Sequence, residues 1–176
     1  MLKEDAAWPR AAAWLKADAG AKADLALLGV PANLTSISAT GANATPDAIR
    51  QALSRYSLQS SLGSIESISA IDAGNIYDPD HNEAVTIAKV AELTTRTELV
   101  VALGGDNSIT YATALGAFGA DLETAGLITF DAHHDIRHGV SNGSPVRRLI
   151  EAGLNPKRIV QIGINDFSNS PAYANE

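Results

Sequence analysis

Short apolar runs alternate along the chain with segments whose apolar positions recur at helical spacing. The apolar runs occupy residues 23–31, 64–74, 98–105, 126–130 and 158–165. The helical segments between them are 45–56, 81–97, 108–119 and 144–153. Short runs bounded by glycine or proline are typical of strands, and strands that alternate with helices are typical of parallel sheets. The pattern predicts a three-layer α/β/α fold with a mostly parallel sheet.

Several helix boundaries carry their own signals. Thr45 can cap the helix 45–56, and Pro46 suits its first turn. Ser108 is interpreted as a cap in the same way, and Gly153 ends the helix 144–153. Ligands of such sheets bind beyond the carboxyl ends of the strands. The loops of interest therefore follow Val30, Leu103, Phe130 and Ile164.

Composition narrows the class of protein. The 176 residues are 45% hydrophobic and 19% charged, which predicts one globular domain over residues 1–176. The formal net charge of -7 argues against nucleic acid and membrane surfaces as partners and favours a small molecule. The absence of cysteine excludes disulfides, thiolate zinc sites and cysteine nucleophiles. Because no signal peptide or membrane span is apparent in the sequence, we expect a cytoplasmic protein.

The segment DAHHD, at 131–135, follows an apolar run and is the strongest candidate for chemistry. In an extended chain Asp131, His133 and Asp135 would share one face, and His134 would point the other way. Two carboxylates and one imidazole suit Mn²⁺, Zn²⁺ or Fe²⁺, and two carboxylates with no thiol in the chain favour Mn²⁺. His134 would then support the site by a hydrogen bond from outside the ligand set, or only pack against it. The alternative is a solvated turn in which these side chains cap backbone groups.

The segment LGGDNS, at 103–108, is a second candidate. Its two glycines allow a tight turn that presents Asp106, Asn107 and Ser108 at the same sheet edge. Gly-Gly-Asp also occurs in ordinary turns, so the motif is weak alone. The sequence has no Walker loop, no GxGxxG and no GxSxG. Metal-activated water is the remaining economical mechanism.

A third segment, 138–149, follows closely on DAHHD. Its Asn142-Gly-Ser144-Pro turn can open a helix and do nothing more, or it can contribute Asn142 and Ser144 to a substrate site. Arg147 and Arg148 are either solvated surface charges or partners for a substrate carboxylate.

Taken in order, the segments ALLGVP, TPDAIRQAL, LGGDNSIT, GLITFDAHHDIR and SNGSPVRRLIEAG resemble the ureohydrolase family, which includes arginase, agmatinase and formimidoylglutamase. The resemblance runs from about Asp24 onwards. It implies an α/β domain with two Mn²⁺ ions, a linear amidine as substrate, and a homo-oligomer in the full-length family. It also implies that Asp131 bridges the metals, that His133 binds one and that Asp135 binds the other.

Two positions depart from the family pattern. Asn107 stands where the family usually has a metal-binding histidine, and it offers a weaker oxygen ligand. The same asparagine makes the chain look particularly like bacterial formimidoylglutamases. Asn142 stands where arginases have a histidine. The resemblance therefore favours hydrolysis of formimidoylglutamate to glutamate and formamide, in histidine degradation, and Arg147 or Arg148 could meet that dianionic substrate. The alternatives are an agmatinase or other guanidino hydrolase, and a non-catalytic metal-binding remnant.

The family closes its metal site with a second carboxylate motif, Asp-x-Asp, on a later strand. After Asp135 this chain has only Asp166. We therefore expect the chain to correspond to the N-terminal part of the family domain, to bind Mn²⁺ poorly and to show little turnover alone. We also expect the segment 158–165 to form an unpaired edge.

Overall fold

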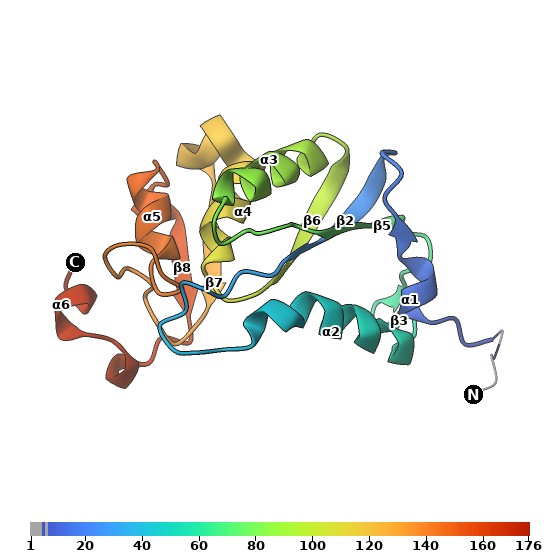
Figure 1. The fold of residues 1–176 in the computed structure, drawn as a ribbon, viewed down its shortest axis with the longest axis horizontal. Helices are drawn as coiled ribbons and strands as arrows, with labels where there is room; N and C mark the ends of the chain where they lie inside the picture. The colour runs from blue at the N-terminus through green and yellow to red at the C-terminus, as the bar shows by residue number, and fades with distance from the viewer. Residues whose placement is uncertain (1–4, 6) are drawn as a thin grey trace.

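Two parallel sheets form the middle layer of the fold (Figure 1). The computed structural model describes residue 5 and residues 7–176. The larger sheet has the order β1-β5-β2-β6 and the smaller one pairs β7 with β8, every pair being parallel. The bounds are β1 Lys16–Ala17, β2 Ala23–Val30, β5 Ala70–Asn75, β6 Thr97–Gly104, β7 Leu127–Phe130 and β8 Ile159–Ile162. A short antiparallel hairpin joins β3 (Gln59–Ser60) to β4 (Gly63–Ser64).

Helices lie on both sides of the larger sheet, which confirms the three-layer α/β prediction (Figure 1). On one side α3 (Glu83–Thr94) packs beside α4 (Ile109–Phe118), and on the other lies α2 (Thr45–Ala52). The remaining helices are α1 (Ala11–Trp14), α5 (Pro145–Glu151) and α6 (Pro171–Ala174). Short 3-10 helices occupy Ala42–Ala44, Leu53–Arg55, Gly119–Thr124, Pro156–Arg158 and Asp166–Ser168. Within the described part of the chain no helix is both long and apolar enough to cross a membrane.

Each sheet has its own apolar core. In the larger sheet Leu28 and Val30 of β2 pack with Val90 and Leu93 of α3, and all four are buried. Full burial of such side chains stabilises the fold by about 1.5–3 kcal/mol each. In the smaller sheet one face packs on a cluster formed by Leu122, Ala125, Leu149 and Leu154. The two cores fix the strand ends from which the loops of interest emerge.

Four local predictions differ from the structure. The strand expected at 64–74 begins only at Ala70, because residues 63–64 pair within the hairpin. The helix expected at 45–56 ends at Ala52 and continues as a 3-10 turn. Thr45 is the first helical residue rather than its cap, since a 3-10 turn precedes it. Ser108 occupies the cap position of α4 but makes no capping bond, because its φ of -57° and ψ of -28° are already helical, whereas a cap needs extended backbone.

Candidate functional site

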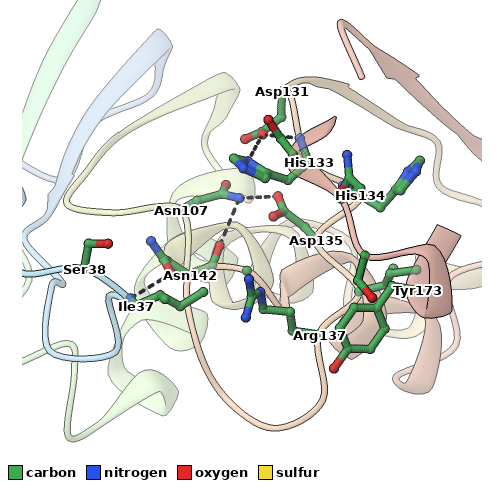
Figure 2. A pocket seen from close by; sticks show the side chains of 15 residues that line it. Ile37, Ser38, Asn107, Asp131, His133, His134, Asp135, Arg137, Asn142 and Tyr173 are labelled. Atoms are coloured by element: carbon green, nitrogen blue, oxygen red, sulfur yellow. Dashed lines mark hydrogen bonds and ion pairs between the residues drawn. The ribbon is translucent and has the colours of Figure 1, made fainter. Parts of the chain in front are cut away.

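The loops that follow β2, β6, β7 and β8 enclose a cavity of about 380 Å³ (Figure 2). This is the sheet edge at which the sequence predicted a site. The lining residues are Ile37, Ser38, Asn107, Asp131, His133, His134, Asp135, Ile136, Arg137, Asn142, Gly143, Ser168, Asn169, Ser170 and Tyr173. The cavity therefore gathers both the DAHHD segment and Asn107.

The DAHHD segment is bent, so the alternation expected of an extended chain does not hold. The carboxylate of Asp131 accepts the backbone N–H of His133 at 2.8 Å and lies 3.0 Å from the Nδ1 atom of the same residue. Asp135 has a left-handed φ of 56°, a conformation that aspartate tolerates better than most residues. As a result His134 lines the same cavity as the other three. Its ring bonds to Gln161 of β8 at 3.0 Å.

Asp135 is the buried carboxylate of the site, with 7% of its surface exposed. Its backbone carbonyl accepts the N–H groups of Val146 and Arg147 at the start of α5. Burial, and then the negative charge of Asp131, raise its pKa to about 6, while the hydrogen bond from Asn107 opposes the rise. A nearby cation would relieve both the burial cost and the repulsion between the two carboxylates.

Asn107 is held by three hydrogen bonds. Its Nδ2 atom donates to Asp135 at 2.5 Å and to the backbone carbonyl of Asn142 at 3.3 Å. Its Oδ1 atom accepts the hydroxyl of Thr110 at 2.8 Å. The amide therefore turns its nitrogen towards Asp135, and the oxygen predicted as a weak metal ligand is engaged by Thr110.

The turn that positions Asn107 needs glycine at position 105. A Cβ atom there would lie 1.8 Å from the carbonyl oxygen of Ala32, so the turn passes directly against the loop after β2. Asp106 joins the same two loops, since it accepts the hydroxyl of Ser36 and the backbone N–H of Ser108.

Of the three residues predicted to bind substrate, one lines the cavity and two do not. Asn142 lines the cavity and accepts the backbone N–H of Ile37 at 3.1 Å. Ser144 is fully buried, pairs with Ser141 and is not among the lining residues. Arg147 also lies outside the lining, because its guanidinium pairs with Glu176.

Arg148 and Arg137 differ in their partners. Arg148 donates to both carboxylate oxygens of Glu83, at 2.7 and 2.6 Å, and stacks on Tyr111. Arg137 lines the cavity, its stem crosses Gly143, and its guanidinium has no ion pair within the described residues (Figure 2). Sequence reasoning missed Arg137 and Tyr173. The signal for Arg137 was its position two residues after Asp135.

The donor set fits a hard divalent cation in kind but not in arrangement. Two carboxylates and an imidazole line one cavity, as Mn²⁺ would require. Within residue 5 and residues 7–176, however, no three His, Cys, Asp or Glu side chains are grouped so that they could hold a metal ion. Asp131 turns to His133, and Asp135 turns to Asn107.

Comparison with known proteins identifies the family. The model of the arginase family matches residues 23–176. Formimidoylglutamases from Halalkalibacterium halodurans and Bacillus subtilis are each 38% identical, and each match covers 84% of this chain and 50% of the relative. The chain thus spans about half the length of these curated relatives.

Solved structures agree. The crystal structure of formimidoylglutamase from Bacillus subtilis matches with a TM-score of 0.87 and 30% identity, over 99% of this chain and 59% of that one. The Trypanosoma cruzi formiminoglutamase, whose structure contains Mn²⁺, matches with a TM-score of 0.82 and 25% identity, over 95% of this chain and 61% of that one. The resemblance seen in the sequence motifs is confirmed, and the chain belongs to the arginase family.

Proposed function

We propose that the cavity is the substrate site of a formimidoylglutamase, in which formimidoylglutamate and water give glutamate and formamide. Family membership supports a hydrolase of this type, and relatives at 38% identity carry this name. The observation that carries the choice of substrate is Arg137, which lines the cavity that also holds the DAHHD segment and has no ion pair within the described residues (Figure 2). A dianionic substrate gains from that charge, whereas cationic agmatine is repelled by it.

We also propose that Asp131, His133 and Asp135 contribute ligands to two Mn²⁺ ions. The Asn107 oxygen would serve as a weak fourth donor only after it leaves Thr110. When bound, such ions activate water and offset the charge that develops on the amidine. Burial of Asp135 near Asp131 supports this role, because the two carboxylates are costly to ionise together without a cation. We propose that the remaining ligands belong to the part of the family domain that the matches to these relatives do not cover.

The residues of the chain would divide the other tasks between them. Arg137 would hold a substrate carboxylate and so orient the formimino carbon towards Asp131 and His133. Asn142 would fix the wall of the cavity through its bond to Ile37. The carboxylate-pairing role that the sequence suggested for Arg147 suits Arg137 better, since Arg147 is engaged by Glu176.

The test compares two proteins, each with Mn²⁺ and with either formimidoylglutamate or agmatine. One is the 176-residue chain. The other is the same chain joined to the part of the Bacillus subtilis relative that follows the matched segment. Formamide release by the joined protein is expected to exceed urea release, and the chain alone is expected to show little turnover. Faster hydrolysis of agmatine would contradict the substrate. Strong turnover by the chain alone would contradict the need for further ligands.

Arg137→Ala in the joined protein sharpens this test. The KM for formimidoylglutamate is expected to rise by about ten-fold or more with little change in kcat, because a charge-assisted hydrogen bond made in the bound substrate is lost. Arg137→Lys should recover part of the loss, and Arg147→Ala serves as the control with a small effect. An unchanged KM for Arg137→Ala would refute the pairing.

The described residues hold no converged ligand group, which counts against catalysis by this chain, and the alternative is a non-catalytic remnant that binds metal through the DAHHD donors. Stoichiometric Mn²⁺ binding without hydrolysis of any amidine by the joined protein would support it over the enzyme.

A further inference from the structure

The segment that follows β7 leaves the sheet, so its backbone polar groups need partners other than a neighbouring strand. Asp131 keeps the last strand bond, since its N–H donates to the carbonyl of Ile162 in β8 at 3.1 Å. The N–H of His133 donates to the carboxylate of Asp131 at 2.8 Å. Ala132 and His134 find partners in β8 and in the loop after it. Because backbone groups removed from water need hydrogen bonds, these partners decide the path of the segment.

Asn169, in the loop after β8, bonds to the segment through both ends of its side-chain amide. Its Oδ1 atom accepts the backbone N–H of His134 at 3.0 Å, and its Nδ2 atom donates to the carbonyl of Ala132 at 2.8 Å. The same Nδ2 atom donates to the carbonyl of Asn165 at 2.9 Å, which ties Asn169 to its own loop. A reversed amide would set donor against donor, so the three partners fix its orientation.

Gln161, in β8, holds the same segment at a second place. Its Nε2 atom donates to the backbone carbonyl of His134 at 3.0 Å, and its Oε1 atom lies 3.0 Å from the ring Nδ1 atom of that residue. Only the amide nitrogen can donate to a carbonyl, so the amide oxygen must face the ring. Since that oxygen can only accept, the Nδ1 atom of His134 carries the proton of this bond.

The ring of His134 is therefore fixed to β8. Figure 2 shows it directed away from Asn107 and Asp135. Its two neighbours in the chain, His133 and Asp135, are both predicted metal ligands. His134 thus anchors the middle of the segment while the residues on either side remain at the cavity.

We propose that Gln161 and Asn169 are positioning residues of the candidate site, and we call the pair the amide clamp. The clamp holds the DAHHD segment in its bent course and holds His134 in the form that is protonated at Nδ1. Asp131 and Asp135 are thereby kept at one cavity. Their use as metal ligands rests on the proposed function, whereas the clamp itself does not.

The protonation form of His134 tests the clamp without metal or substrate. The sample is the 176-residue chain, labelled with ¹⁵N at its 4 histidines. Long-range ¹H–¹⁵N spectra at about pH 9, where free histidine is neutral, report which ring nitrogen carries the proton. For His134 we expect Nδ1. Gln161→Met, which keeps the length of the side chain and removes both bonds, should populate the Nε2 form.

Gln51→Met is the matched control, because Gln51 is exposed on α2, and it should leave the spectrum of His134 unchanged. A proton on Nε2 of His134 in the unmodified chain would overturn the proposal. So would a Gln161→Met variant in which His134 keeps its proton on Nδ1.

Exchange of the backbone N–H of His134 tests Asn169. Asn169→Ala is expected to speed this exchange by about ten-fold, because the N–H loses its acceptor. Asn169→Asp, which keeps an oxygen for that N–H, should recover part of the protection. Asn82→Ala is the control, since the side chain of Asn82 makes no capping bond to α3. Equal exchange in the unmodified chain and in Asn169→Ala would contradict the role of Asn169.

The joined protein shows whether the clamp matters to the site. Gln161→Met is expected to raise by about ten-fold the Mn²⁺ concentration that gives half-maximal formamide release, as does loss of a group that orients metal ligands. A lower melting temperature with an unchanged Mn²⁺ requirement would assign the clamp to stability alone and overturn the positioning role. An inactive joined protein in which His134 carries its proton on Nδ1 would contradict the proposed function and support the clamp.

Discussion

The strands β2 and β7 are both largely apolar, but they lie in different environments. In β2 the five residues from Ala26 to Val30 are all buried, with a strand on each edge and helices on both sides of the sheet. In β7 no residue is buried, a strand lies on one edge, and the core of the smaller sheet covers one face. An apolar sequence therefore predicts that a strand can be buried. How much of it is buried depends on the strands and helices that pack against it.

Replacing one apolar residue in each strand should give the largest difference in the free energy of unfolding between the two strands. Leu28→Ala is expected to lower the free energy of unfolding by about 2–5 kcal/mol, because it leaves a cavity in a closed core. Ile128→Ala should change it by no more than about 0.5 kcal/mol, since 64% of that side chain is exposed. Urea unfolding followed by circular dichroism measures both. Equal losses would mean that the side chain of Ile128 is covered in solution.

Two glycines extend the comparison to the ends of the strands. Gly105→Ala, just after β6, is expected to cost about 1–3 kcal/mol, because the new Cβ atom meets the backbone of Ala32 at 1.8 Å and the loop must move. Gly126→Ala, just before β7, is the matched control. Its nearest contact, the carbonyl oxygen of Arg158, is 3.7 Å away. Thermal unfolding of both variants checks the difference, and similar melting temperatures would refute the tight packing at Gly105.

Much of the fold could be predicted because apolar periodicity and glycine or proline boundaries are local signals. Pro46 and Pro145 both lie in the first helical turn, as their sequence positions indicated. The hairpin and the split between β6 and β7 could not be predicted, since they depend on contacts between distant segments. Periodicity records the apolar surface of β6 but not whether its second edge finds a partner.

The sequence predicted part of the lining of the cavity but not the orientation of its side chains, and it also named Ser144 and Arg147, which do not line the cavity. Asp131, His133, Asp135 and Asn107 all line one cavity, because carboxyl ends of parallel strands gather their loops at one edge. The alternation argument was wrong about geometry, since it assumed an extended chain where Asp135 takes a left-handed conformation. The sequence also could not show that Arg147 pairs with Glu176 while Arg137 lines the cavity. These contacts depend on the folded positions of residues far apart in sequence.

The smallest expected effect on the free energy of unfolding comes from replacing a charged side chain near each of the two sheets. In the larger sheet the carboxylate of Asp18, next to β1, accepts a hydrogen bond from Arg96 at 2.6 Å, and this bond holds its pKa below the ordinary value. Because the pKa in the folded chain is below that of the unfolded chain, about 3.9, the stabilisation is complete above about pH 5 and is lost as the pH falls through the folded value. Asp18→Asn should therefore cost about 1 kcal/mol near neutral pH and progressively less in acid.

The matched control for Asp18 lies near the smaller sheet. Glu123 is exposed in the turn before β7 and has no ion-pair partner in the part of the chain that the structure describes, so Glu123→Gln should leave the unfolding free energy nearly unchanged at every pH. Urea unfolding of both variants between about pH 3 and pH 7 measures the contrast. A loss for Asp18→Asn that stays constant with pH would show that packing rather than charge joins Asp18 to Arg96. The larger and smaller sheets would then differ in stability through burial of apolar side chains and not through ion pairs.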